Sequence, residues 1–269
     1  MSNQPDLAEG RYLLYLDILG FSELVRTKGK SEVLATITEA LHSFGRWEEL
    51  NQCFRTIYFS DTFLFYQESK GYGSWAFCDV YAIGAFVLTR LLAKGIPARG
   101  VITYGDFDVH HDVAGRHQVY FGQAFIEAHE AEKKEGWLGI SIQPSAWLPF
   151  ETGSPGIIAA FEQEKVWIRR NDNVLLLNPF IKLRGWHPED LIGEIDAPYM
   201  EWDRPDFPNE ILAFKFLREQ ADLFAERRDF TGRVAAKYHN TNALLKKMFG
   251  PDLYAWACKI SELQGERVI

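Results

Sequence analysis

Two aspartates stand where the surrounding sequence predicts buried strands. Asp17 ends the apolar run in RYLLYLDILGF, and Asp61 interrupts the strand-like stretch RTIYFSDTFLFY. A carboxylate is costly to bury unless a cation or a metal ion compensates its charge. Each aspartate alone could be an ordinary residue at a strand end or in a hairpin, so the question is whether the fold brings the two together.

The chain between the two aspartates is long enough for one helix and a return strand. They can therefore lie on adjacent strands, where two carboxylates repel each other unless a divalent cation lies between them. Mg²⁺ and Mn²⁺ take such oxygen ligands and usually share coordination with substrate phosphates. A sharp turn at Gly20 would leave the N–H groups of Gly20, Phe21 and Ser22 free for phosphate oxygens. The pair favours a metal site beside a phosphate cradle.

The elements that must position these residues follow from hydrophobic periodicity. Strands are predicted over 11–19, 54–59, 62–66, 98–111, 118–122, 139–142, 165–169 and 173–177. Helices are predicted over 31–47, 75–94 and 124–135, from Pro144, and from Asn209 to the end. Strands that alternate with helices but include hairpins predict an α+β fold with helices on one face of a sheet. The glycine-rich loop of a doubly wound parallel sheet is missing.

Composition sets the domain organisation and excludes some partners. The 269 residues are 47% hydrophobic, enough for one large domain or for one domain with a smaller appendage. Prolines at 188, 198, 205 and 208 mark a connector, so we predict a catalytic domain over residues 1–180 and a connector with a helical C-terminal extension over 181–269. The net charge of −8 argues against nucleic acid as a partner.

Location follows from the cysteines and the apolar segments. The three cysteines lie far apart in no metal-ligand spacing, and the polar N-terminus lacks a signal-peptide pattern, so a cytoplasmic location is expected. Residues 75–95 approach the ~20 apolar residues of a spanning helix. They contain Asp79 and Arg90, however, and we predict a buried helix and no membrane.

Four stretches resemble, in order, the motifs of class III nucleotidyl cyclases. YLDILGFSELV is similar to the first metal motif, IYFSDTFLF to the second, IPARGVITYGDF to the basic-x-Gly-Ile-x-x-Gly strand, and VYFGQAFIEAHEAEK to the Gly-x-x-Val-Asn-x-Ala-x-Arg helix. The resemblance covers residues 11–178. It implies a ferredoxin-like βαββαβ core with a helical C-terminal extension.

The resemblance also implies a mechanism and a set of site residues. The enzyme would be a homodimer with composite active sites, in which Asp17, Asp61 and the Ile18 carbonyl hold two divalent ions, Mn²⁺ or Mg²⁺. The ribose 3′-oxygen would attack the α-phosphate and release pyrophosphate, which makes the enzyme a phosphorus–oxygen lyase. Gly20 and Phe21 would bind the triphosphate. Arg99 is a candidate phosphate contact, with a strand-edge salt bridge as the alternative.

Several departures from the family pattern concern the substrate. The two places that read a purine are occupied by Ile57 and Val119, interpreted as a buried apolar pair, which cannot hydrogen-bond a purine edge. The places of the transition-state asparagine and arginine hold Ile126 and Glu130. The acidic helix EAHEAEKKE is interpreted as solvent-facing, with Glu127 and Glu130 as lesser candidates for reaching the site.

These departures resemble the bacterial pyrimidine cyclases of the Pycsar antiphage defence system. Bulky aromatic side chains are expected to line a shallower base pocket: Tyr58, Phe59 and Tyr104. The resemblance predicts conversion of UTP to 3′,5′-cyclic UMP and pyrophosphate, a second messenger in antiviral defence. The alternatives are a cytidylate cyclase that makes cyclic CMP, a catalytically inactive nucleotide-binding protein of the same fold, and a magnesium-dependent phosphohydrolase. A histidine-rich stretch, DFDVHHDVAGRHQ, is interpreted as a solvated hairpin rather than a metal cluster.

Overall fold

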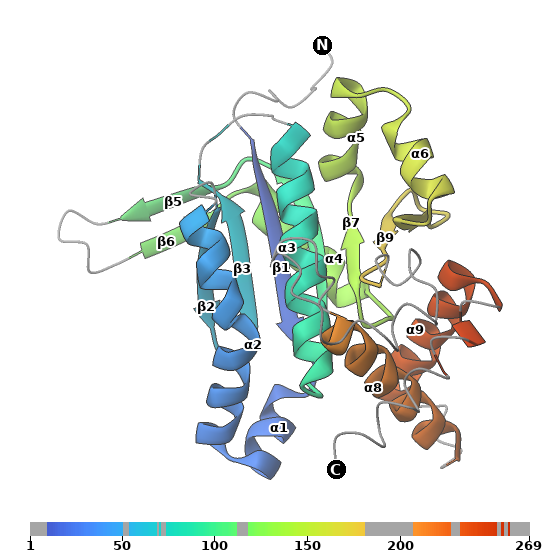
Figure 1. The fold of residues 1–269 in the computed structure, drawn as a ribbon. Helices are drawn as coiled ribbons and strands as arrows, with labels where there is room; N and C mark the ends of the chain where they lie inside the picture. The colour runs from blue at the N-terminus through green and yellow to red at the C-terminus, as the bar shows by residue number, and fades with distance from the viewer. Residues whose placement is uncertain are drawn as a thin grey trace, which may run out of the picture.

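The protein is built around one large mixed β-sheet with helices packed against it (Figure 1). The structure, a computed structural model, describes residues 10–50, 54–68, 70, 74–111, 118–180, 207–226, 232–251, 254, 255 and 258. Side chains at 42–50, 74–75, 111, 118 and 207–208 are not described.

Seven strands form this sheet in the order β2-β3-β1-β4-β7-β9-β8. Their bounds are β1 (Arg11–Ile18), β2 (Phe54–Phe59), β3 (Thr62–Gln67), β4 (Ala98–Gly105), β7 (Ile140–Ile142), β8 (Trp167–Arg169) and β9 (Leu175–Leu177). Strand β1 lies between β3 and β4 and is antiparallel to both, whereas β4 and β7 are parallel. The predicted α+β class is confirmed, and the unit from β1 to β4 has the order and directions of a ferredoxin-like βαββαβ core.

Helices cover both faces of the sheet. Their bounds are α1 (Phe21–Lys28), α2 (Lys30–Leu50), α3 (Ser74–Ala93), α4 (Gln123–Lys134), α5 (Pro144–Gly153), α6 (Ile157–Gln163), α8 (Phe207–Glu226) and α9 (Arg233–Phe249). Helices α2 and α3 pack on one face, and α4 packs on β1 and β4 from the other (Figure 1). The expectation of helices on one face was therefore wrong.

The alternation of side chains along β1 explains both layers. Leu14 and Leu16 belong to the large core on the α3 side, whereas Leu13 and Tyr15 belong to a smaller core beneath α4. Because a strand covered on both sides needs apolar residues at every position, β1 reads as a continuous apolar run. Asp17 follows on the same face as Leu13 and Tyr15, because alternate residues of a strand share a face.

The predicted strand over 98–111 is two strands. β4 ends at Gly105, and β5 (Asp108–His111) pairs with β6 (Gln118–Phe121) in a separate hairpin that projects from the sheet (Figure 1). Phe107, between β4 and β5, is fully buried in the smaller core. The burial of this side chain beneath α4 turns the chain out of the sheet. Two short helices, α1 and α6, were not predicted.

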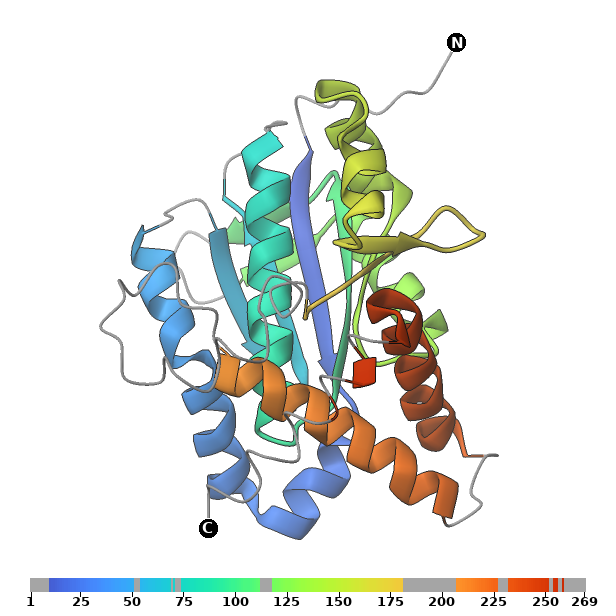
Figure 2. The same ribbon diagram turned by 45° about the vertical axis from the view of Figure 1, so that its right-hand side comes forward.

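The C-terminal helices share the large core. Helix α8 packs across one end of α3, and α9 packs against α8 (Figure 2). Phe214 of α8 contacts Phe180 and Phe249 through ring pairs at 6.1 and 5.8 Å. The predicted connector lies outside the described residues, so the division at residue 180 stays a prediction.

Helix α3 is the described helix that is long and apolar enough to cross a membrane, over Ala76–Ala93. It lies between the sheet and α8, with Val80, Val87, Leu88 and Leu91 fully buried. This packing is that of a core helix, as the sequence predicted.

Candidate functional site

The two aspartates lie beside each other at one end of the central strands. In the sheet register, Asp17 of β1 stands between Thr62 of β3 and Arg99 of β4. Asp61 directly precedes Thr62, and its carbonyl accepts a hydrogen bond from the Ile18 N–H at 2.9 Å. The predicted arrangement on adjacent strands is therefore present in the structure.

The hairpin that carries Asp61 has a tight two-residue turn. Phe59 of β2 pairs directly with Thr62 of β3, which leaves only Ser60 and Asp61 to connect them. Ser60 adopts a left-handed conformation with φ 57°, which hairpin turns of this length require. The turn fixes the backbone of Asp61 next to the end of β1.

Negative charge accumulates around Asp17. The pKa of Asp17 is raised from 3.8 to about 7, chiefly by burial and then by the charges of Glu132 and Asp61, while Arg99 and a hydrogen bond from Thr62 act in the opposite direction. Two neighbouring carboxylates are thus close enough to disfavour the ionised form of Asp17. This is the electrostatic environment that a bound cation relieves.

Glu132 is the site residue that the sequence analysis missed. It lies on α4, is 4% exposed, and forms an ion pair with the Arg99 guanidinium. Ala124 and Ala128 of the same helix are also buried. Glu132 continues their i, i+4, i+8 series, so helical periodicity could have placed it on the face that packs against β1 and β4.

The two acidic residues considered from sequence lie elsewhere on the helix. Glu130 is exposed. Glu127 accepts a hydrogen bond from Ser145 at 3.0 Å, and burial raises its pKa. Neither contributes to the charge around Asp17.

Arg99 is held by α4. Besides the ion pair with Glu132, its Nη1 donates to the carbonyl oxygen of Glu135 at 3.1 Å. The alternative that the sequence left open, a salt bridge, is what the structure shows. A phosphate contact by Arg99 stays a prediction.

Tyr15 places a hydroxyl group on the same face of the sheet as Asp17. Its hydroxyl lies 3.3 Å from Nδ1 of His129 and 3.5 Å from the Thr62 hydroxyl. Burial raises the pKa of Tyr15 above 10, so it remains a neutral donor. Sequence periodicity placed Tyr15 in the core but gave no sign of the histidine partner on α4.

The predicted phosphate cradle coincides with the start of a helix. Gly20 adopts a left-handed conformation with φ 71°, and α1 begins at Phe21, immediately after the strand that carries Asp17. No side chain caps this helix, so the first-turn N–H groups have no side-chain acceptor. Because the positive end of the helix dipole is also here, the turn suits an anion.

The predicted aromatic wall is only partly at the site. Tyr58 points to the other face of the sheet, where its ring packs against Phe63 and Phe65. Tyr104 is also on that face and packs on Tyr12. Phe59 is the member of the set on the Asp17 face, because directly paired residues share a face.

The positions that depart from the cyclase pattern are distributed over two elements. Ile57 is partly buried against the smaller core, as expected. Val119, however, is 54% exposed on the β5–β6 hairpin, so the predicted buried apolar pair was wrong for this residue. Ile126 is 50% exposed on α4. The hairpin projects from the sheet and has no helix over it, which leaves Val119 accessible.

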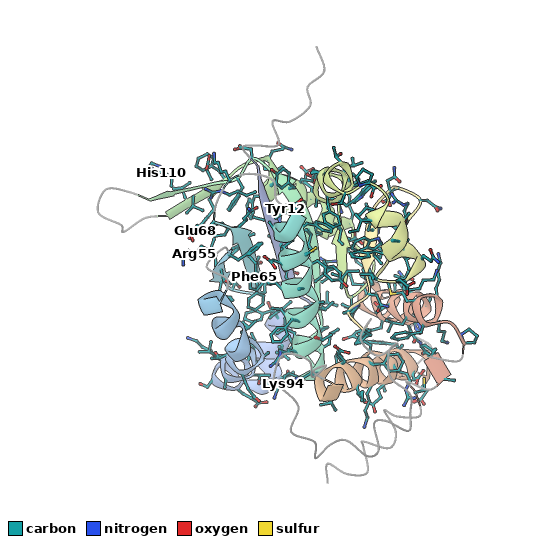
Figure 3. All side chains as sticks on the ribbon, turned by 45° about the horizontal axis from the view of Figure 1, so that its top comes forward. Tyr12, Arg55, Phe65, Glu68, Lys94 and His110 are labelled. Carbon is teal, nitrogen blue, oxygen red and sulfur yellow. The ribbon has the colours of Figure 1, made fainter. Side chains whose placement is uncertain are left out.

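The described residues contain no group of three or more His, Cys, Asp or Glu side chains placed to hold a metal ion. The donor set at the strand ends consists of two carboxylates and a backbone carbonyl, which is the oxygen chemistry that Mg²⁺ and Mn²⁺ prefer. The repulsion around Asp17 fits a cation there. Part of the histidine-rich stretch forms β5, where His110 is exposed on the projecting hairpin (Figure 3), and His117 lies outside the described residues.

No protein-family model matches the sequence, and no curated protein matches it. Among solved structures, the chain is similar to the monomeric guanylyl cyclase domain of the RhoGC fusion protein from the aquatic fungus Blastocladiella emersonii (12% identity, TM-score 0.46, 63% of this chain and 95% of that chain). It is similar to the guanylate cyclase domain of RhGC from Catenaria anguillulae in complex with GTP (13%, 0.45, 53% and 82%). The adenylyl cyclase CyaB from P. aeruginosa is also similar (12%, 0.38, 53% and 81%). These are cyclase domains, the family that the motifs resemble, and we draw no functional conclusion from overlaps of this extent.

Proposed function

We propose that the protein is a metal-dependent nucleotidyl cyclase that converts a pyrimidine nucleoside triphosphate, UTP, to its 3′,5′-cyclic monophosphate and pyrophosphate. The observation that carries the proposal is the placement of Asp17 and Asp61 on neighbouring strand ends beside the uncapped start of α1. A site for hard cations and a site for phosphate oxygens thus adjoin. Metal-assisted phosphoryl transfer needs this combination.

Each residue of the site would have a separate task. Asp17, Asp61 and the Ile18 carbonyl would hold two divalent ions, which supply activation of the 3′-hydroxyl and neutralisation of the leaving group. The N–H groups of Gly20 and Phe21 would bind the triphosphate. The 3′-hydroxyl would release its proton to solvent as its oxygen bonds to the α-phosphorus, while the bond to the bridging oxygen breaks and pyrophosphate departs with that electron pair.

Arg99 would contact the phosphates only after its ion pair with Glu132 breaks. Its side chain is 12% exposed and its Nε faces Glu132. A polyanion of higher charge could compete for the guanidinium, and the displaced Glu132 carboxylate would then lie beside the cations at Asp17. Glu132 would thereby stabilise the metal-loaded site.

The pyrimidine assignment rests on what the base-reading positions lack. Neither Ile57 nor Val119 carries a side chain that can donate to or accept from a purine edge. A site without hydrogen-bonding side chains at these positions cannot select a purine strongly through its edge. UTP, the antiviral role of its product and the alternative CTP all follow from the resemblance to pyrimidine cyclases.

A homodimer is part of the proposal. Val119, Phe121 and Ile126 are large apolar side chains, each half exposed, and they belong to β6 and the helix that follows it. Clustered exposed apolar residues mark interaction sites. A second copy that covers this surface would supply the rest of a composite active site.

The experiment is product analysis by chromatography with mass detection, with purified protein given ATP, GTP, CTP or UTP and Mn²⁺. Cyclic UMP that disappears in Asp17→Asn and Asp61→Asn, while Asp106→Asn behaves as wild type, supports the proposal; Asp106 is an exposed aspartate outside the site. Formation of cyclic CMP would show that the substrate is CTP and not UTP, and a cyclic purine nucleotide would contradict the assignment from Ile57 and Val119. A linear mono- or diphosphate would indicate a phosphohydrolase.

One observation favours an inactive nucleotide-binding protein as the second candidate. The helix positions at which the family carries its transition-state asparagine and arginine hold Ile126 and Glu130. Absence of any product in a folded, dimeric protein that still binds Mn²⁺ and UTP by calorimetry would establish this second function.

A further inference from the structure

A cavity lies away from the aspartates, between the turn that follows α4, the β8–β9 hairpin and α9. Its volume is about 460 Å³, within the range of small-molecule sites. We call it the α9 pocket and define it by Trp137, Ile168, Arg170, Asn171, Leu244 and Lys247. None of the residues proposed above to bind metal or phosphate lines it.

The lining of the α9 pocket has a distinctive composition. Aliphatic and aromatic side chains form its walls, two asparagines and three cationic residues complete it, and none of the described residues that line it is a carboxylate. This is unusual in a chain with 37 acidic and 29 basic residues. A cavity with apolar walls and only cationic charged residues in its lining favours an anion that carries an apolar body.

The charge of that anion follows from the partners of the cations. Arg170 binds both oxygens of Glu135, at 2.9 and 3.2 Å, and also Asp172. Arg169 binds both oxygens of Glu162. Each arginine is therefore already engaged by carboxylates, one for Arg169 and two for Arg170.

Lys247 differs from the two arginines. It is exposed, and within the part of the chain that the structure describes no carboxylate pairs with it. Lys247 is thus the cation left to contact a ligand, and a single such contact suits a monoanion better than a triphosphate.

Trp137 supplies an independent observation. Its side chain lines the pocket and is 3% exposed, and its indole N–H has no hydrogen-bond acceptor among the described residues. Buried donors are rarely left unpaired in folded proteins. An acceptor atom on a molecule in the pocket would satisfy this donor.

We propose that the α9 pocket binds a small aromatic monoanion of the carboxylate class. The carboxylate would pair with Lys247, the ring would pack on Ile168, Leu244 and Trp137, and an acceptor atom would receive the indole N–H. This binding goes beyond the proposed cyclisation reaction and does not depend on it.

The test is calorimetric titration of the full chain, without metal, with 2-naphthoate as the probe. We expect binding of one molecule per chain. Lys247→Glu should weaken it at least about tenfold, because one charge-assisted contact is reversed. The matched control is Lys246→Glu, which makes the same charge change one residue away, on a lysine that does not line the pocket, and it should bind as wild type does.

Three results would overturn the proposal. The first is no binding to protein that is folded by circular dichroism. The second is equal affinity for another probe. Equal affinity for 2-naphthamide, the neutral analogue, would show that the charge of the ligand is not recognised, and equal affinity for inorganic phosphate would show that its apolar body is not. The third is an equal effect of the two lysine variants, which would indicate general electrostatics. Trp137→Phe should weaken binding without changing the stoichiometry, and unchanged affinity would exclude the indole contact.

Discussion

Replacement of Asp17 by asparagine should make the metal-free protein more stable above neutral pH. The carboxyl ionises near pH 3.8 in the unfolded chain and near 7 in the folded one. Between these values the folded state holds the proton more tightly, so stability falls as pH rises through the window, and the full penalty is present above pH 7. Asparagine keeps the shape of the protonated acid and carries no such penalty.

The magnitude follows from the same pKa change. Each tenfold change in an acid constant corresponds to ~1.4 kcal/mol, so the displacement from 3.8 to about 7 would represent ~4 kcal/mol. Solvent reaches the half-buried carboxylate and screens its charge, which roughly halves the effect, to about 2 kcal/mol. Asp17→Asn should gain this amount at about pH 8, and the gain should shrink steadily as the pH falls toward about 4.

The assay is urea denaturation at fixed protein concentration with a chelator present, at a series of pH values. Glu130→Gln is the matched control, because this exposed glutamate belongs to the same helix as Glu132. A loss of stability in Asp17→Asn at high pH, or a gain that does not vary with pH, would refute the account of charge around Asp17. Added Mn²⁺ should stabilise the wild type and leave Asp17→Asn unchanged, which links the same carboxylate to the metal.

Three further substitutions test the parts that hold the site in place. Gly122→Ala should cost about 3 kcal/mol, because φ is 141° and a Cβ would lie 2.3 Å from the Asp106 carbonyl oxygen; an unchanged melting temperature would contradict this. Thr241→Val should cost about 1–3 kcal/mol by removing the hydroxyl that accepts the Leu138 N–H at 2.7 Å, measured by urea denaturation and compared with Thr241→Ser. Glu135→Gln should cost about 2 kcal/mol, because it removes the charge from a buried carboxylate bound through both oxygens to an arginine; equal thermal stability would show that this ion pair contributes nothing.

The strands of the βαββαβ core were predictable because their sequences are short apolar runs with clear ends. The predicted 54–59 coincides with β2, and the predicted 11–19 exceeds β1 by one residue. The juxtaposition of Asp17 and Asp61 followed from these strands and the chain length between them. Pairing in the sheet then depends on topology, which a β-α-β-β order restricts strongly.

Other features depended on information that one sequence does not carry. Helix α1 has only eight residues, of which Phe21 and Leu24 pack on the large core, and two turns give too short a periodic pattern to detect. The face of the sheet on which Tyr58 lies depends on the length of the hairpin turn. A shift of one residue in the pairing would place Tyr58 on the Asp17 face and Phe59 on the opposite face. Glu132 was missed because acidic residues on a charged helix were interpreted as solvent-facing, although its spacing from two buried alanines indicated otherwise.

Glu135 connects two regions of the molecule, one through its side chain and the other through its backbone. Its side chain binds Arg170 at the α9 pocket, while its backbone carbonyl accepts a hydrogen bond from Arg99 beside the aspartates. The turn that begins at this residue is also fastened to α9, since Asn240 donates to the Gly136 carbonyl at 2.8 Å. A displacement of α9 would therefore move a residue that holds Arg99, and this chain of contacts would connect the C-terminal helices to the guanidinium proposed to meet the substrate.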